Sequence, residues 1–495
     1  MSDKLRMKRN SRLNLSAVHN GFAYQLQAVE AVKSMDYAAL FHEQGLGKTK
    51  IGIDLALEWL KADLVDTILF VTKRGLVTNW SEEMQQHSHL RPRILDQNHS
   101  ANFFAFNSPA PVLLTHYEVM RTEERRLALY LRTRRVGVIL DEAHKIKNPD
   151  AEISKALHRL APAFSRRIIM TGTPVANRPY DVWSQIYFLD HGEALGEDFD
   201  TFKADLELSN DLWADDRKRA SFERSAANVF SRIAAFSVRE TKASAGIELP
   251  EKIVENVPVE LAPRQREMYD EIAGTLRTEV LVDGKLVEDD AEATLKRLLR
   301  LVQVASNPGL IDESYREEPA KLSALRRLLN DALAEPDAKA IIWSNFIDNV
   351  DWLARELESY EPVKVHGRIE MDERADAIVR FKGDPACRIL VATPGSAKEG
   401  LTLTVANHAI FYDRSFSLDD YLQAQDRIHR ISQQRTCYVW NLIARPSVDE
   451  WVDALLAAKR LAAQLIQSDV GKEEYEAAAN YDFGRIVQQI LGGQE

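Results

Sequence analysis

Short apolar runs recur along the first half of the chain, and apolar residues return every three or four positions in the stretches between them. The runs span 38–43, 67–72, 111–117, 136–142 and 166–172. Nearly continuous apolar strands that alternate with amphipathic helices are typical of a parallel sheet covered on both faces. The pattern returns at 338–346, 363–367, 387–394, 408–414 and 436–444. It therefore predicts an α/β fold with two doubly wound lobes.

Helical periodicity dominates the chain between these two sets of runs. An extended segment at 253–261 interrupts it, and Asp283–Gly284 marks a tight hairpin at 281–287. The domain boundaries that we expect follow the chain in order: a flexible basic tail at 1–20, a first lobe at 21–180, helical insertions and a linker at 181–335, a second lobe at 336–468 and a helical C-terminal tail at 469–495.

The composition excludes several classes of protein. A chain of 495 residues is too long for one ordinary core, and 45% hydrophobic with 28% charged residues is typical of a globular protein. No apolar run approaches the ~18–20 residues that cross a bilayer, and the basic N-terminus lacks a secretory signal. We therefore expect a cytoplasmic protein with no membrane partner. The net charge of −11 argues against non-specific binding of nucleic acid but leaves a local basic groove possible.

The chain has two cysteines, Cys387 and Cys437, and both stand among apolar and β-branched residues. Two cysteines so far apart form neither a disulfide framework nor a zinc ribbon. We expect both to fill space in the core.

The segment Glu-Gln-Gly-Leu-Gly-Lys-Thr-Lys (43–50) follows a predicted strand and precedes a predicted helix. Backbone N–H groups around Gly45 and Gly47, with the helix N-terminus, suit a chain of phosphates. Lys48 would reach the outer phosphates, and the Thr49 hydroxyl would ligate Mg²⁺. His42 stands where the full spacing of this motif has glycine. The alternative is a chance Gly-Lys-Thr in a strand–helix turn.

A second group of residues with the same chemistry lies at 136–144, where an apolar strand ends in Asp141 and Glu142. The carboxyl edge of a parallel sheet is where α/β ligands bind. Asp141 would hold Mg²⁺ and Glu142 would orient the attacking water. The alternative, a solvated strand end or helix cap, is weak downstream of a phosphate loop.

Two further segments support this site. Thr171 and Thr173, in the turn Thr-Gly-Thr-Pro after the next strand, are placed to hydrogen-bond near His144. Gln25, at the start of an amphipathic helix, offers an amide for the adenine edge. In isolation, the first is equally well a turn that ends a strand, and the second a glutamine on a helix surface.

The second lobe carries Arg427 and Arg430 within residues 423–435. The two arginines are three positions apart, so we expect them on one face of a helix. An arginine inserted from another lobe stabilises the charge of a transferring γ-phosphoryl group. A solvated basic helix is the alternative.

The series of motifs resembles the superfamily-two helicase-like ATPases, specifically their Swi/Snf-type branch, over about residues 20–460. The matching segments are Tyr24–Gln25, 43–49, 71–80, 141–148, 171–184, 248–252, 261–269, 302–308, 343–346 and 426–433. The continuation Lys145-Ile146-Lys147-Asn148 after the acidic pair separates this branch from other helicase-like proteins.

The resemblance implies two RecA-like lobes with helical insertions, ATP and Mg²⁺ as cofactors, and double-stranded DNA as the track. It assigns adenine contacts to Gln25, phosphate contacts to Lys48 and Thr49, and the metal and water chemistry to Asp141 and Glu142. Arg427 and Arg430 would be arginine fingers, and Gln423 would couple them to the nucleotide. Departures from the family are His42, Ser432, and Lys398 in the segment that keeps Gly400.

The expected function is an ATP-dependent duplex-DNA translocase that remodels or displaces bound proteins. A strand-separating helicase and an ATP-gated subunit of a larger complex are the alternatives. By analogy with the family, a compact motor of this kind suits the nucleoid of a bacterial or phage-infected cell. We expect a monomer, with a protein partner for recruitment as a further possibility.

Overall fold

The computed structural model describes residues 13–108, 110–208, 212, 215–282, 285–286, 291–396, 402–479 and 486. These residues form two compact units. The first unit takes its described residues from 1–207, 222–248 and 465–469, and the second from 208–221, 249–464 and 470–495. The chain between 181 and 335 is thus shared between the two units.

The first unit contains a parallel sheet with the strand order β3-β4-β2-β5-β6-β1-β7 in the described part of the chain. Its strands are β1 (Tyr37–Leu40), β2 (Thr67–Thr72), β3 (Arg93–Ile94), β4 (Val112–His116), β5 (Val136–Asp141), β6 (Arg166–Met170) and β7 (Ser237–Val238). The five strands predicted for the first half are confirmed. The sequence did not predict β3 and β7, because two residues are too few to show a periodicity.

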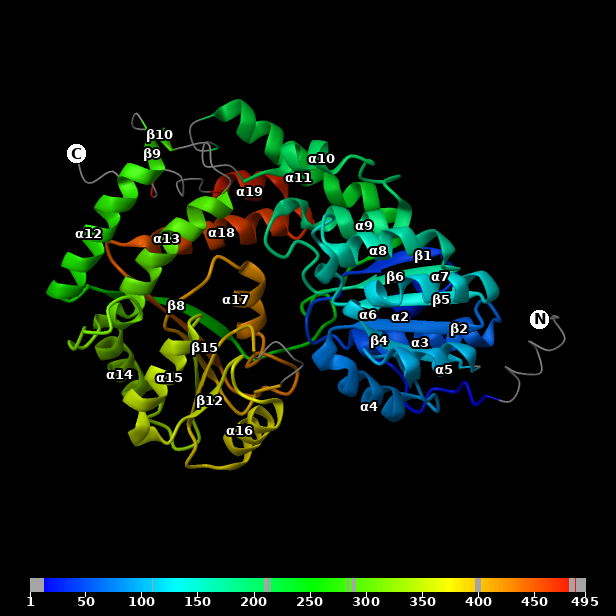
Figure 1. The fold of residues 1–495 in the computed structure, drawn as a ribbon, viewed down its shortest axis with the longest axis horizontal. Coiled ribbons are helices and arrows are strands. Elements are labelled where there is room, and N and C mark those ends of the chain that lie inside the picture. Colours follow the sequence, from blue (N-terminus) through cyan, green and yellow to red (C-terminus); the bar gives the residue numbers. More distant parts are fainter. Residues whose placement is uncertain are drawn as a thin grey trace. The chain divides into compact units, whose positions relative to one another are not determined.

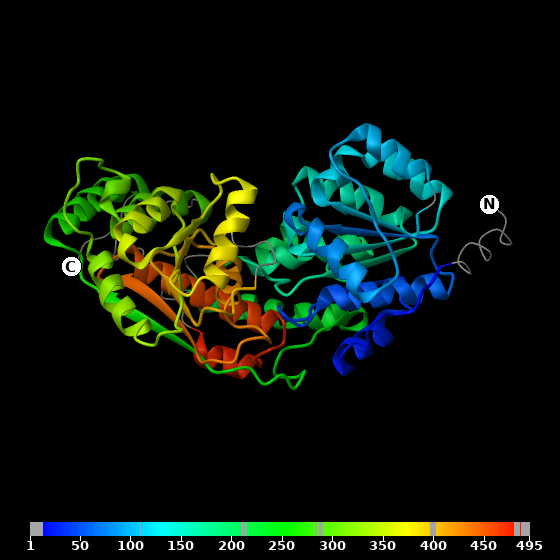
Figure 2. The same ribbon diagram turned by 90° about the horizontal axis from the view of Figure 1, so that it is seen from below.

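Helices flank this sheet (Figures 1 and 2). They are α2 (Ala23–Val32), α3 (Lys48–Lys61), α4 (Val77–His87), α5 (His99–Asn107), α6 (Tyr117–Thr122), α7 (Glu124–Thr133), α8 (Glu152–Leu160), α9 (Trp183–Asp190) and α10 (Phe199–Leu206). Helix α11 (Asp216–Ile233) belongs to the first unit from residue 222 onward. The core of the unit is built around α3, in which Ile51, Leu55 and Trp59 are fully buried.

The second unit contains a parallel sheet with the order β12-β13-β11-β14-β15-β8. Its strands are β8 (Lys252–Val259), β11 (Ala340–Trp343), β12 (Val363–Val365), β13 (Ile389–Ala392), β14 (His408–Phe411) and β15 (Cys437–Ala444). All five strands predicted for the second half are confirmed. The extended segment predicted near 253–261 is also a strand, β8, which pairs with β15 at the edge of this sheet.

The second unit also holds the remaining helices and a hairpin. The helices are α12 (Pro263–Val280), α13 (Ala291–Ser306), α14 (Ala320–Ala332), α15 (Ile347–Glu356), α16 (Met371–Gly383), α17 (Leu418–Gln425), α18 (Val448–Ile466) and α19 (Lys472–Ala478). The predicted hairpin is confirmed, because β9 (Leu281–Val282) and β10 (Lys285–Leu286) are antiparallel. Its central residues, Asp283 and Gly284, lie outside the described residues.

Side chains of the second sheet alternate between two cores. Ile341 and Trp343 of β11 pack in one cluster, whereas Ala340 and Ile342 pack in another. Successive residues of a strand point to opposite faces, so each face of this sheet is covered by apolar side chains. The fold class is therefore confirmed: two parallel sheets flanked by helices.

Both cysteines are buried and unpaired, as the sequence predicted. Burial raises the pKa of the Cys437 thiol to about 11, so the thiol stays protonated at neutral pH. Across the described ranges, no helix is long and apolar enough to cross a membrane.

Candidate functional site

The phosphate loop lies between the end of β1 and the start of α3 at Lys48. Gly45 and Gly47 have φ angles of +88° and +68°, in the left-handed region that glycine enters without steric cost. A Cβ atom on Gly47 would lie 2.4 Å from Nε2 of Gln25. Backbone conformation and space both require glycine at position 47.

Hydrogen bonds of the Gln25 side chain connect the start of α2 to this loop. Its side-chain Oε1 accepts a hydrogen bond from Phe22 N at 2.9 Å, and its Nε2 donates to Leu46 O at 3.1 Å. The residue is only 4% exposed, so these two bonds fix the amide next to the loop. Its contact with adenine stays a prediction.

Lys48 is buried and folds back onto its own loop. Its Nζ donates to the carbonyl oxygens of His42 at 2.9 Å and Glu43 at 3.3 Å. Within the described part of the chain, the Thr49 side chain makes no hydrogen bond. At the N-terminus of α3, an ammonium group can donate hydrogen bonds to a triphosphate, and a hydroxyl oxygen can bind the accompanying cation.

Asp141 ends β5 and is held by two neighbouring elements. Its Oδ2 accepts hydrogen bonds from Trp80 Nε1 at 2.7 Å and Thr72 Oγ1 at 3.0 Å. No described residue donates to its Oδ1. Burial and the adjacent Glu142 raise the pKa of Asp141, while Trp80 and Lys48 oppose that rise.

This donor set fits Mg²⁺, a cation that prefers oxygen ligands and binds through few protein groups together with phosphates and water. Asp141 Oδ1 and the Thr49 hydroxyl are the oxygens that would hold it. Among the described residues, no group of three or more His, Cys, Asp or Glu side chains is arranged around a metal position. A cation here would depend on phosphate oxygens as further ligands.

Glu142 has a strained backbone, with φ at +53° and ψ at +50°. A left-handed residue other than glycine costs about 1–2 kcal/mol and is common at functional sites. His144 Nδ1 lies 3.2 Å from Glu142 Oε2. Burial opposes ionisation of Glu142, but His144 and two nearby lysines outweigh it and hold its pKa well below the ordinary value. The carboxylate is thus ionised, and a charged carboxylate can accept a hydrogen bond from a water molecule and orient it.

The turn after β6 meets this group from the next strand. His144 Nδ1 also lies 3.3 Å from Thr171 Oγ1, which confirms the predicted contact between Thr171 and the histidine. The backbone N–H of Thr173 donates to the same Thr171 oxygen at 3.1 Å. Gly172 lies against the phosphate loop, because a Cβ there would meet Gln44 Cγ at 2.7 Å and Lys48 Nζ at 3.2 Å.

Asp181 joins two of the motifs, a role that the sequence did not reveal. Its Oδ2 accepts from the backbone N–H groups of Asn177 and Arg178 at 2.8 and 3.1 Å. The same oxygen lies 3.3 Å from Lys147 Nζ. The signal in the sequence is an aspartate four residues after an asparagine, and this spacing is not specific.

The second unit holds Gln423, Arg427 and Arg430. The predicted helical face for the two arginines is wrong, because α17 ends at Gln425 and both arginines lie in the turns that follow. Arg427 O accepts a hydrogen bond from Leu403 N at 3.0 Å, a long-range bond that replaces a further turn of helix. Gln423 is on α17 and donates to Asp419 at 2.7 Å.

Arg430 is held by polar groups on both sides of its turn. Its Nε donates to Asp426 O at 2.9 Å and its NH1 to Thr402 Oγ1 at 2.8 Å. Ser432, a departure from the family pattern, pairs its hydroxyl with that of Thr404 at 2.9 Å. Lys398 and Gly400 lie outside the described residues.

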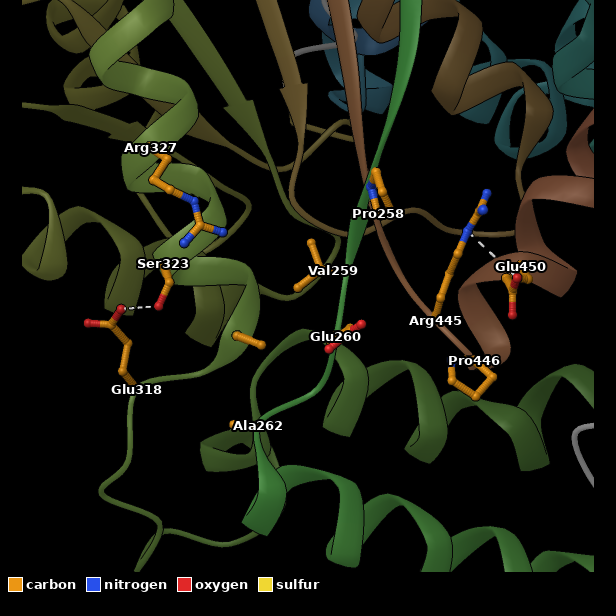
Figure 3. Close-up of a pocket in the computed structure, with 11 residues that line it drawn as sticks. Pro258, Val259, Glu260, Ala262, Glu318, Ser323, Arg327, Arg445, Pro446 and Glu450 are labelled. Atoms are coloured by element: carbon orange, nitrogen blue, oxygen red, sulfur yellow. Dashed lines mark hydrogen bonds and ion pairs between the residues drawn. The ribbon is translucent and has the colours of Figure 1, made fainter.

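A separate open groove of about 900 Å³ lies at the edge of the second sheet (Figure 3). Its walls include the end of β8 at Pro258 and Val259, the α14 residue Arg327, and Arg445 beside Glu450. None of the predicted site residues lines it.

Comparison with known proteins gives two family matches and several relatives. A model described as the SNF2-related domain matches residues 24–310, and one described as the helicase conserved C-terminal domain matches residues 320–432. The chain is similar to an uncharacterized ATP-dependent helicase of Mycoplasma pneumoniae, with 25% identity over 98% of this chain and 46% of that protein.

The chain is also similar to the RAD54-like DNA repair and recombination protein of Danio rerio, with 25% identity over 90% of this chain and 65% of that protein. Among solved structures it is similar to a Sulfolobus solfataricus SWI2/SNF2 ATPase core in complex with double-stranded DNA. That match has 26% identity and a TM-score of 0.41, and it covers 94% of this chain and 98% of the other. The chain spans less than two thirds of the length of the curated relatives named here.

Proposed function

Because this chain belongs to the SNF2-related family, we propose that it hydrolyses ATP to move along double-stranded DNA and to remodel or displace bound proteins. The observation that carries the proposal is the pair of carboxylates at the end of β5, beside a phosphate loop of the first unit. Asp141 keeps one oxygen to which no described residue donates, and Glu142 is strained and ionised. That division of roles suits metal binding and activation of water.

In the proposed reaction, Lys48 leaves its own carbonyls and binds the outer phosphates, while Gln25 contacts adenine. The Thr49 hydroxyl and Asp141 would hold Mg²⁺, which would neutralise phosphate charge when bound. Glu142 orients a water molecule for attack and accepts its proton, and His144 fixes the position of the glutamate. Phosphoryl transfer depends mainly on such positioning and charge neutralisation.

The second unit would contribute Arg427 and Arg430 as arginine fingers, with Gln423 supporting their connection to the nucleotide. A guanidinium group that reaches the transferring phosphoryl stabilises charge that is greatest in the transition state. The turns that carry both arginines, rather than a regular helix, support this role, since loops position catalytic side chains in many enzymes.

Double-stranded DNA as the track is supported by the Lys145-Ile146-Lys147-Asn148 continuation that marks the Swi/Snf-type branch. The printed name of the Danio rerio relative, a DNA repair and recombination protein, also favours DNA. A strand-separating helicase and an ATP-gated subunit of a larger complex remain the alternatives. A recruiting protein partner and a monomeric state are part of the proposal.

The test compares ATP hydrolysis in the presence of duplex DNA, single-stranded DNA and RNA, alongside displacement of a triplex-forming strand and unwinding of a duplex. The proposal expects the strongest stimulation by duplex DNA, triplex displacement that depends on ATP, and no unwinding. Unwinding would select the helicase. Stimulation by RNA alone would overturn DNA as the track, and binding of DNA without turnover would select the ATP-gated subunit.

A further inference from the structure

A short segment runs along the first residues of the phosphate loop, on the side away from β6. Strand β7 pairs with the end of β1, with Ser237 opposite Ala39 and Val238 opposite Leu40. The pairing continues past both strands, because Phe41 N donates to Val238 O and Glu43 N donates to Glu240 O, each at 2.8 Å. We call residues 238–242 the bracing segment.

Two basic side chains of the bracing segment bind the same stretch of loop. The Glu43 carboxylate accepts from the backbone N–H of Lys242 at 2.8 Å and lies 3.3 Å from its Nζ. Lys242 is only 7% exposed, which strengthens the attraction between the two charges. Arg239 NH1 donates to the carbonyl oxygen of Phe41 at 3.3 Å.

Arg239 also forms an ion pair with Asp469, a residue much later in the chain. Its Nε donates to Asp469 Oδ1 at 2.8 Å, and its NH2 donates to Asp469 Oδ2. The two parallel bonds form the forked geometry in which arginine binds a carboxylate most strongly. Asp469 follows α18 and belongs, with residues 465–468, to the first unit.

These contacts include Glu43, one of the two loop residues whose carbonyl groups bind Lys48. The carbonyl groups of His42 and Glu43 accept the hydrogen bonds of Lys48 Nζ. The bracing segment binds Glu43 directly, and His42 lies between Glu43 and Phe41, which the segment also binds. A small shift of the bracing segment would therefore move the part of the loop that holds Lys48.

Arg239 and Asp469 lie close in sequence to points where the chain passes between the two units. The chain passes from the first unit to the second after Glu248 and returns at Leu465. Arg239 and Asp469 each lie within ten residues of one of these two connections. Movement at either connection would therefore act close to residues that contact the phosphate loop.

We propose that Arg239, Asp469 and Lys242 are positioning residues that set the phosphate loop for hydrolysis when DNA is engaged. The inference rests on the proposed function, since it concerns the same ATPase site. The three side chains act through the loop carbonyls and Glu43, and none of them touches the reacting atoms.

The test uses Asp469→Asn in the full chain, with ATP hydrolysis measured with and without duplex DNA. Asparagine keeps the size of the side chain but loses the charge that grips Arg239. The expected result is a loss of about fivefold or more in the DNA-stimulated kcat, with the basal rate, the KM for ATP and the melting temperature close to those of the unchanged protein. Asp469→Glu should restore most of the stimulation.

The matched control is Glu124→Gln, which breaks another forked pair of the first unit. Arg159 donates to Glu124 at 2.7 and 2.8 Å on α8 and α7, away from the phosphate loop. The control should leave stimulation unchanged. Lys242→Gln provides a second, independent variant with the same expected selective loss.

Three outcomes would overturn the inference: full stimulation in both Asp469→Asn and Lys242→Gln, equal losses of basal and stimulated rates, or an equal loss in the Glu124→Gln control. Failure of the proposed function is distinguishable from these, because in that case the unchanged protein itself would show no hydrolysis that responds to duplex DNA.

Discussion

The indole N–H of Trp80 donates a 2.7 Å hydrogen bond to Oδ2 of Asp141. Trp80 lies on α4 and is 1% exposed, and its ring packs on Phe70 with centroids 4.9 Å apart. The bond fixes the carboxylate through Oδ2, leaving Oδ1 without a donor among the described residues, and it opposes the rise in pKa that burial causes. Trp80 is therefore a support of the candidate metal ligand.

Replacing Trp80 with phenylalanine removes this donor but keeps an aromatic ring in the core. We expect kcat for ATP hydrolysis to fall about tenfold and the Mg²⁺ concentration for half-maximal rate to rise. The control is Trp59→Phe, because Trp59 is equally buried in the same unit but donates to Lys33 O at 2.9 Å. The measurement is the rate of ATP hydrolysis by both variants across a range of Mg²⁺ concentrations. An equal dependence on Mg²⁺ in the two variants would contradict the role of Trp80 in orienting Asp141.

Glu142→Gln keeps the shape of the side chain and removes the proton acceptor. We expect hydrolysis to fall about 100-fold or more, with ATP binding and the melting temperature retained. Lys48→Ala should also abolish hydrolysis, but by weakening phosphate binding. The control is Glu152→Gln, a side chain 68% exposed on α8. Normal turnover by the Glu142 variant would refute the assigned chemistry.

Gly172→Ala places a methyl group against Gln44 and Lys48. The added Cβ would force the phosphate loop to shift, and small displacements of catalytic groups cost about 100-fold in rate. We expect such a loss of hydrolysis with little change in DNA binding. Gly274→Ala, on α12, is the control because nothing lies within 4 Å of a Cβ there. Similar rates for the two variants would show that the loop tolerates the shift.

Arg430→Ala removes the guanidinium group that the turn after α17 holds. If Arg430 stabilises the transition state, kcat should fall about 1,000-fold while the Kd for ATP changes little. Arg445→Ala is the matched control, since Arg445 lies in the groove of the second unit beside Glu450 (Figure 3). A weakened Kd with unchanged kcat would instead assign Arg430 to ground-state binding.

Two buried histidines predict how stability depends on pH. Burial, assisted by nearby cations, lowers the pKa of His42 and of His408 from 6.5 to about 4. The folded state therefore keeps both rings neutral, while the unfolded chain protonates them below its own pKa. Each neutral buried histidine makes its full contribution to the free energy of unfolding above pH 6.5. This contribution, about 3 kcal/mol for each histidine, is lost as the pH falls toward 4.

The measurement is the free energy of unfolding at pH 8, 6 and 4.5, from denaturant titrations. His42→Leu and His408→Leu should each flatten the fall in stability on acidification, whatever they do to stability at pH 8. Among the described residues, neither ring nitrogen of His42 has a hydrogen-bond partner, so protonation of the ring gains no acceptor there. An unchanged slope in both variants would show that other groups cause the acid sensitivity.

Much of the fold was predictable because its signals are local. Five strands in each sheet appear in the sequence as apolar runs, because a strand covered on both faces carries apolar side chains at most positions. The positions of the glycine-containing turn between β1 and α3 and of the carboxylates at 141 and 142 were predictable because they depend on short, fixed spacing. The end of α17 could not be predicted from the sequence, because the helical periodicity continues past Gln425. In the structure the helix ends at Gln425, and the carbonyl oxygen of Arg427 instead accepts a hydrogen bond from the backbone N–H of Leu403.

The sequence by itself determined the fold class, the family resemblance and the residues that carry the candidate chemistry, because each is encoded by neighbours a few positions apart. The tertiary structure decided which side chains hold those residues in place. Trp80 on Asp141 and Asp469 on Arg239 join positions 61 and 230 residues apart. Pairs at such separation leave no periodicity in the chain, because their partnership is created only when the strands and helices pack.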